Sequence, residues 1–187
     1  ELVKGAEAVI HVAGLTTAPD MAAFEAGNVT GTLNLAEAAL AAGVPRFVLV
    51  SSLSAREPEL SLYGKSKARA EQVVKASGLD WTIVRPPAVY GPRDDAMFEF
   101  FRAARWGVVP MPAEGKASLI HAEDLVRLLL ALVPGGEEVT GKSFEPDDGK
   151  PGGWPHYDLA RAIGWAVGRR PWVLRMPPGL MRLAARG

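Results

Sequence analysis

The sequence predicts an α/β fold: a doubly wound parallel sheet with a small C-terminal cap lobe. Short apolar runs rich in valine and isoleucine alternate with helical segments of ten or more residues, and glycine or proline stands at most of the junctions. Because a helix separates each pair of strands, the connections are crossovers, and crossovers join parallel strands.

The first strand and the first helix are expected before Pro45. Residues 8–13 (AVIHVA) form a short apolar run that ends at Gly14, which is typical of a parallel strand buried on both faces. A helix is expected from Asp20, as the N-cap, to Gly43. The helical period gives it a buried stripe made of Phe24, Asn28, Gly31, Leu35, Ala38 and Ala42. Asn28 is therefore predicted to be a polar residue on a buried face.

Two strands and another helix follow. Residues 47–50 (FVLV) predict a strand that stops at Ser51 and Ser52, and a polar loop continues through Pro58. A helix is expected over residues 63–77, ending at Gly78. Residues 81–84 (WTIV) predict the next strand, which Arg85-Pro86-Pro87 closes.

The second half of the chain is less regular. Helices are expected over residues 95–106, 123–133 and 156–167, and a short strand over residues 141–145. Loops rich in proline and glycine are expected between the first two helices and over PDDGKPGGWP. We expect this half of the chain to form the cap lobe.

Composition excludes several classes of function. The 21 basic residues equal the 21 acidic ones, so no net field favours nucleic acid or an anionic membrane as a partner. The absence of cysteine excludes thiolate catalysis and cysteine-bound zinc, and it fits a reducing compartment, for which the cytoplasm is the default. The longest apolar stretch, residues 128–133, is far shorter than the roughly 20 residues that span a bilayer. The three histidines have no metal-binding spacing, so no metal site is predicted.

Ser52, Tyr63 and Lys67 predict a proton-transfer site. Tyr63 and Lys67 lie four residues apart, hence on one helix face, and Ser52 ends a strand eleven residues upstream of Tyr63. A free phenol titrates near pH 10, and proton transfer near neutral pH needs about 4 kcal/mol of phenolate stabilisation, much of which a nearby ammonium supplies. Ser52 has no suitably placed histidine to activate it, so it is expected to donate a hydrogen bond rather than to attack.

These motifs resemble a known family. HVAG (11–14), NVTGTLNLAEAA (28–39), RFVLVSS (46–52), YGKSK (63–67), TIVRPPAVYGP (82–92) and IHAEDLVRLLL (120–130) are similar, in order, to the motifs of the extended short-chain dehydrogenase/reductases, the NAD-dependent epimerase/dehydratase group. The resemblance implies a Rossmann-like fold, NAD or NADP as cofactor, and a small-molecule substrate. It also implies an active site of Ser52, Tyr63 and Lys67 supported by Asn28.

The same resemblance implies the cofactor contacts and the division of the chain. The contacts would involve Ala13, Gly14, Tyr63, Lys67, Pro86, Pro87 and Val89. Residues 1–94 and part of 108–145 would belong to the dinucleotide-binding domain, and residues 95–107 and 146–187 to a substrate or cap lobe. Family members commonly dimerise through the two long helices, so a homodimer is possible.

The sequence departs from the family pattern in two places. It lacks the opening strand and the Gly-rich turn that hold the pyrophosphate, so the chain reads as N-terminally incomplete and is expected to bind dinucleotide poorly or not at all by itself. Leu53-Ser54 replaces the acidic pair of the dehydratases, and the segment from Ser52 to Tyr63 is shorter than in sugar-nucleotide epimerases.

Two functions stay open at this point. A reductase or dehydrogenase acting on a secondary alcohol or ketone fits best, as in the hydroxysteroid dehydrogenase and flavonol reductase branches. The alternative is a non-catalytic dinucleotide-binding accessory or sensor protein. Each motif also has a purely structural interpretation: Gly14 as a strand end, and Asn28 as a partner for a loop carbonyl.

Overall fold

The structure, a computed structural model, describes residues 3–177 and divides into two compact units. Unit 1 comprises Glu1–Pro87 and Glu123–Pro146, and unit 2 comprises Ala88–Ala122 and Asp147–Gly187. The sequence placed residues 88–94 and part of 108–122 with the first domain instead. The division of labour predicted for the two parts stays a prediction.

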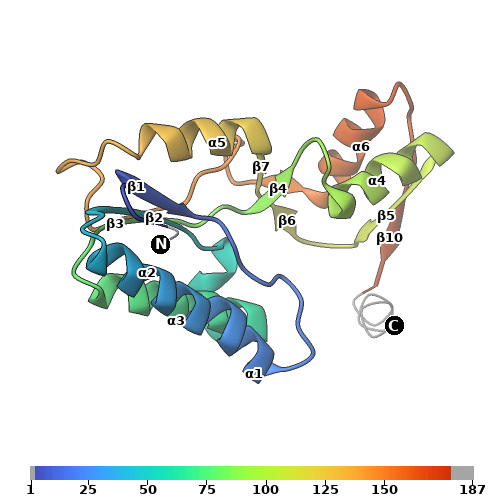
Figure 1. The fold of residues 1–187 in the computed structure, drawn as a ribbon. Coiled ribbons are helices and arrows are strands. Elements are labelled where there is room, and N and C mark those ends of the chain that lie inside the picture. The colour runs from blue at the N-terminus through green and yellow to red at the C-terminus, as the bar shows by residue number, and fades with distance from the viewer. Residues whose placement is uncertain (1–2, 178–187) are drawn as a thin grey trace. The chain divides into compact units, whose positions relative to one another are not determined.

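Unit 1 is built on a parallel four-stranded sheet in the order β1-β2-β3-β8. Its strands are β1 (Ala8–His11), β2 (Arg46–Val50), β3 (Asp80–Val84) and β8 (Lys142–Phe144). Figure 1 shows α2 (Gly31–Ala41) and α3 (Leu62–Ala76) on one face of this sheet and α5 (Ala122–Ala131) on the other. The predicted α/β class with a doubly wound parallel sheet is confirmed.

The first predicted helix contains a π-helical turn. Asp20 is the N-cap, as expected, and its side chain accepts a hydrogen bond from the Ala23 amide at 2.8 Å. The chain then forms α1 (Met21–Phe24), the π-helix η1 (Glu25–Thr30) and α2. A π turn closes over i→i+5 and takes in an extra residue, so every later side chain rotates to a neighbouring position.

The π turn corrects the predicted stripe. Phe24 and Asn28 are buried as expected, but beyond them the buried positions are Thr32, Ala36 and Ala39. Of the predicted set, Ala38 and Ala42 are exposed, and Gly31 and Leu35 are only partly buried. The shift by one residue follows from the wider turn, which a period of 3.6 does not contain.

Helix α3 is preceded by two short 3₁₀ helices where the sequence predicted only a polar loop. These are η2 (Leu53–Arg56), with Ser52 as N-cap, and η3 (Pro58–Leu60). Ser61 caps α3, and its hydroxyl accepts a hydrogen bond from the Gly64 amide at 3.0 Å. A methyl group at Gly64 would lie 2.6 Å from the Ser54 carbonyl oxygen. Glycine at this position therefore lets η2 pack directly on the first turn of α3.

Unit 2 contains more strands than the sequence predicted. Its strands form three two-stranded ribbons, parallel β4–β7 and β5–β10 and antiparallel β6–β9. The bounds are β4 (Ala88–Tyr90), β5 (Val108–Pro112), β6 (Lys116–Ala117), β7 (Leu119–His121), β9 (Trp154–Pro155) and β10 (Trp172–Met176). Helices α4 (Asp95–Trp106) and α6 (His156–Ala166) agree closely with the predicted ranges. The segments expected to be loops thus hold short strands that periodicity does not reveal.

The core of unit 1 lies between the sheet and α2 and α3. Phe47, Leu49 and Ile83 are at most 1% exposed and pack with Ala36, Ala39 and Val74. Arg46 is also buried, and its guanidinium donates to the Leu132 carbonyl, the Thr82 hydroxyl and Asp80. Among residues 3–177, no helix is both long and apolar enough to cross a bilayer.

Shortening a core side chain should destabilise unit 1. Leu49→Ala removes a fully buried side chain and leaves a cavity, so we expect the free energy of unfolding to fall by about 2–5 kcal/mol. Leu40, which is 55% exposed on α2, provides the control, and Leu40→Ala should change stability far less. Urea unfolding of the two variants measures the difference, and equal losses would contradict this description of the core.

Candidate functional site

The predicted site residues of unit 1 gather at the carboxyl ends of the parallel strands. Gly14 follows β1, Ser52 follows β2, and Pro86 and Pro87 follow β3. Because the three strands are parallel, these residues share one edge of the sheet. Ligands of open α/β sheets bind at this edge.

Lys67 is the buried cation of the site. It lies on α3, is 5% exposed, and its Nζ donates a hydrogen bond to the Val50 carbonyl at 2.8 Å. Burial lowers the pKa of Lys67 to about 8, and the negative charge of Glu71 opposes this effect. Lys67 stays charged near neutral pH, and its ammonium has two further donors for a ligand.

Gly14 lies against two of the predicted residues. A Cβ at this position would stand 3.1 Å from Asn28 Oδ1 and 3.5 Å from Lys67 Nζ. The close approach explains why position 14, in the loop that follows β1, is a glycine. It also brings Gly14, Asn28 and Lys67, which the sequence proposed separately, into one place.

Asn28 ties the loop after β1 to helix α3. Its Oδ1 accepts from the Leu15 amide at 2.6 Å, and its Nδ2 donates to the Leu15 carbonyl at 3.0 Å and to the Ser66 hydroxyl at 2.8 Å. Ser66 in turn donates to the Tyr63 carbonyl at 2.8 Å. The expectation that Asn28 bonds a loop carbonyl is confirmed, and the loop is fixed to the first turn of α3.

His11 belongs to the core of unit 1. It is buried, and its Nε2 lies 2.9 Å from the Thr32 hydroxyl, which donates to the Asn28 carbonyl. Burial and the nearby charge of Lys67 lower the pKa of His11, so its imidazole is neutral. His11 therefore has a structural role in the core.

Ser52 and Tyr63 flank the packed junction of η2 and α3. The Ser52 hydroxyl accepts a hydrogen bond from the Ser54 amide at 3.2 Å, as the N-cap of η2. The half-buried Tyr63 ring lies 6.2 Å from the ring of Phe24, centroid to centroid. None of the hydrogen bonds described above joins Ser52, Tyr63 and Lys67 directly. Ser52 and Lys67 are each bonded to a different backbone group.

The remaining predicted cofactor residues are divided between the units. Ala13 is exposed beside Gly14, Pro86 is buried, and its carbonyl accepts from the Leu53 amide at 2.9 Å. Pro87 is partly buried at the end of the first segment of unit 1. Val89 lies in β4 of unit 2.

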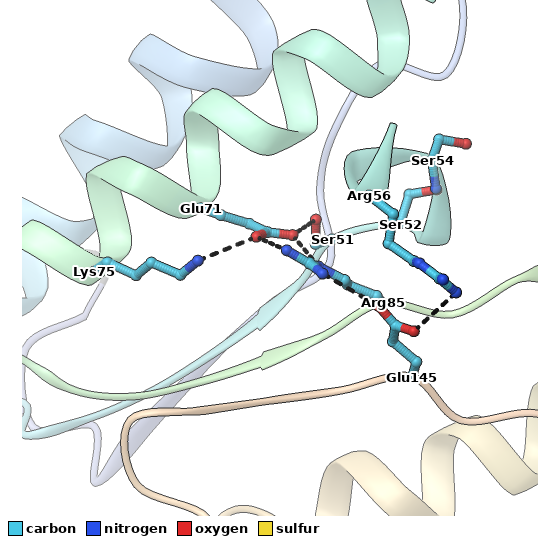
Figure 2. A network of polar contacts seen from close by, with 8 residues as sticks. All are labelled: Ser51, Ser52, Ser54, Arg56, Glu71, Lys75, Arg85 and Glu145. Atoms are coloured by element: carbon cyan, nitrogen blue, oxygen red, sulfur yellow. Dashed lines mark hydrogen bonds and ion pairs between the residues drawn. The ribbon is translucent and has the colours of Figure 1, made fainter. Parts of the chain in front are cut away.

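A buried ionic network next to the site was not predicted. The carboxylate of Glu71 is 1% exposed and lies between Ser51, Arg85 and Lys75 (Figure 2). The signal for it was present in the sequence: Glu71 stands four residues after Lys67, on the helix face expected to meet the core. A glutamate on such a face needs a buried partner, and Arg85 directly follows the next strand.

Fold and site together define a dinucleotide-binding α/β protein, with glycine, serine and a buried lysine at the strand ends of a parallel sheet. The chain belongs to the NAD(P)H-binding family, which matches residues 1–99. The expected resemblance to the extended short-chain dehydrogenase/reductases is thereby confirmed, as is the cofactor class of NAD or NADP.

Two curated relatives are enzymes of this kind. Ceramide reductase from Caulobacter vibrioides is 41% identical over 98% of this chain and 58% of the relative's length. UDP-glucose 4-epimerase from Vibrio cholerae is 27% identical over 89% of this chain and 57% of the relative. The chain thus spans under two thirds of the length of either relative.

Solved structures agree with the fold. MoeE5 in complex with UDP-glucose and NAD superposes with a TM-score of 0.77 and 25% identity, over 94% of this chain and 67% of that one. UDP-N-acetylglucosamine 4-epimerase from Bacillus cereus superposes with a TM-score of 0.79 over 94% of this chain and 68% of that one. At 23% identity, the second likeness supports the fold alone.

Removing the Asn28 amide should release the loop after β1. Asn28→Ala leaves the amide and carbonyl of Leu15 and the buried Ser66 hydroxyl without their partner, so we expect a loss of about 1–3 kcal/mol in the free energy of unfolding. Asn34→Ala, at an exposed position on α2, which directly continues η1, is the matched control. Hydrogen exchange of the Leu15 amide should accelerate in the first variant alone, and unchanged protection there would contradict the assigned role.

The titration of Lys67 should be visible in the pH dependence of stability. Because burial lowers its folded-state pKa from 10.5 to about 8, the unfolded chain binds more protons between these values. The free energy of unfolding should therefore rise with pH across this window, relative to a Lys67→Met variant that cannot titrate. Urea unfolding of both proteins at about pH 7 and about pH 10 tests this, and parallel pH curves would refute it.

Proposed function

We propose that the intact protein is an NAD(P)-dependent oxidoreductase that interconverts a secondary alcohol and a ketone. The observation that carries the proposal is the charged, buried Lys67 beside Gly14, one helical turn from Tyr63 and at the strand end that precedes Ser52. This arrangement supports the proposal, because a phenol, a hydroxyl and an ammonium near the carboxyl ends of parallel strands suit the region where such folds bind ligands. A protein that only bound dinucleotide would not need the phenol.

The residues present fit a nicotinamide cofactor. A Cβ at Gly14 would lie 3.5 Å from Lys67 Nζ, so glycine keeps the loop close to the lysine that would meet the cofactor. Lys67 has free donors that would hold the ribose hydroxyls, and the segment from Pro86 to Val89 would supply backbone contacts. When bound, the nicotinamide would supply or accept the hydride.

The proposed proton transfer runs through Tyr63. In ketone reduction, the phenol gives its proton to the carbonyl oxygen of the substrate as the carbonyl carbon receives the hydride. In alcohol oxidation, the phenolate takes the proton back. Ser52 would donate a hydrogen bond to the same oxygen while keeping its contact with the Ser54 amide, since that contact uses a lone pair of the hydroxyl oxygen. Lys67 would stabilise the phenolate through its charge.

Reduction is favoured over epimerisation as the overall reaction. The relative with 41% identity is named a ceramide reductase, whereas the epimerase is 27% identical. Unit 2 also contains a cavity of about 230 Å³ with a mostly apolar lining. It is lined by Tyr90, Met97, Phe101, Leu119, Asp148, Trp154, Leu159, Ala162, Ile163 and Ala166. Such a cavity suits a substrate that carries an alkyl chain better than a sugar nucleotide.

Removing the Tyr63 hydroxyl tests the proposal. In the intact protein, Tyr63→Phe should lower turnover by a factor of about 10² or more, because the proton donor is lost, while the Kd for NAD(P)H stays nearly unchanged. Tyr157→Phe, at an exposed position of unit 2, is the control and should leave both values unchanged. Turnover is measured with a long-chain ketone and NAD(P)H, and the Kd for NAD(P)H is measured by direct binding. Full turnover by Tyr63→Phe would leave the accessory or sensor protein as the better account.

A further inference from the structure

The Glu71 carboxylate is fully occupied by partners at the ends of two strands. Its Oε1 accepts from the Ser51 hydroxyl at 2.6 Å and from Arg85 Nε at 2.8 Å, and its Oε2 accepts from a terminal nitrogen of Arg85 at 2.7 Å. Lys75 Nζ lies 3.5 Å from Oε2. The hydrogen bonds from Arg85 and Ser51 keep the pKa of Glu71 low although burial alone would raise it, so the group is an anion.

The network continues from Arg85 to the far side of Ser52. Arg85 donates to Glu145 Oε1 at 3.2 Å, and Glu145 Oε2 accepts from Arg56 at 3.2 Å. Arg56 is the last residue of η2, the short helix that Ser52 caps. Figure 2 shows the resulting chain of side chains, from Ser51 through Glu71, Arg85 and Glu145 to Arg56, and it labels Ser52 and Ser54 beside that chain. Both segments that flank Ser52 are therefore anchored to one network.

The same carboxylate is one helical turn from Lys67. Lys67 is bonded to the carbonyl of Val50, and Glu71 is bonded to the hydroxyl of the next residue, Ser51. Two successive turns of α3 thus hold two successive residues at the end of β2. The position of α3 along the sheet is fixed at the place where Ser52 begins.

We propose that Glu71 is a positioning residue for the site: through Arg85, Glu145 and Arg56 it fixes the segments on both sides of Ser52, and its carboxylate lies one helical turn from Lys67. The inference rests on the proposed function, because it assigns Glu71 a role in the same proton-transfer site. It predicts that the charge of Glu71, and not only its packing, matters to Lys67.

The groups that face Lys67 make the effect of Glu71 specific. His11 on β1 has a lowered pKa, Asn28 is an uncharged amide, and Glu71 is the anion that acts on Lys67. Removing this anion withdraws the one effect that opposes burial. The pKa of Lys67 should then fall below its present value of about 8.

The experiment is an NMR titration of Lys67 in the intact protein labelled with ¹³C at lysine Cε, the signal being assigned by its loss in Lys67→Arg. In Glu71→Gln, which keeps the shape and removes the charge, the midpoint of the Lys67 titration should fall by about one pH unit or more. The alkaline limb of kcat should move to lower pH by the same amount. Glu37→Gln, at an exposed position on α2, should leave both unchanged.

Two further variants separate charge from folding. If Glu71→Gln does not fold, the double variant Glu71→Gln/Arg85→Met removes the buried pair together, which proteins tolerate better than a lone buried charge. Its reference is Arg85→Met, which keeps the Glu71 carboxylate, and the Lys67 midpoint should be lower in the double variant than in this reference. Glu145→Gln removes the charge that pairs with both Arg56 and Arg85 and leaves the Glu71 carboxylate in place, so kcat should fall severalfold with the Lys67 midpoint unchanged. An unshifted Lys67 midpoint in the variants that remove the Glu71 charge would overturn the inference.

The failure of the proposed function would look different. Full turnover by Tyr63→Phe would refute the proton-transfer assignment and would leave the Lys67 titration as it stands. A normal loss of turnover in Tyr63→Phe together with an unshifted Lys67 midpoint in Glu71→Gln would refute the role of Glu71 alone.

Discussion

Helix α3 is held over the sheet by charge as well as by apolar packing. Glu71 is almost fully buried, and it accepts hydrogen bonds from Ser51 at the end of β2 and from Arg85 at the end of β3. Leaving such a charge unpaired would cost several kcal/mol, so α3 cannot slide along the sheet without losing these partners. Tyr63 and Lys67 lie on the same helix, and their distance from the strand ends depends on this ion pair.

A second constraint fixes the other side of the site. Asn28 is directed at the loop after β1 by a π-helical turn, and it bonds both that loop and Ser66 on α3. Gly14 is consequently held against Asn28 and Lys67. The ends of the three parallel strands therefore lie along one edge of the sheet, with Gly14, Asn28 and Lys67 close together at that edge.

The sequence predicted much of unit 1 and far less of unit 2. Apolar runs and helices of 3.6-residue period are visible without a structure. The sequence correctly predicted Asp20 as an N-cap, Ser52 at the end of a strand, and the range of α3. The π turn was not visible, because it changes the period within a helix and leaves no composition signal. Most residues in the strands of unit 2 are exposed or only partly buried, and β5 contains Pro110 and Pro112, so few continuous apolar runs mark these strands.

The sequence by itself determined the fold class, the family and the residue types at the strand ends. These are encoded locally, in the order of apolar runs, glycines and polar residues along the chain. Only the tertiary structure decided which of those residues meet. The pairing of Glu71 with Arg85, and of Arg85 with Glu145, joins residues 14 and 60 positions apart. Gly14 and Lys67, which lie close together, are 53 positions apart. Such partners are brought together by the parallel sheet, whose crossovers place distant residues at one edge.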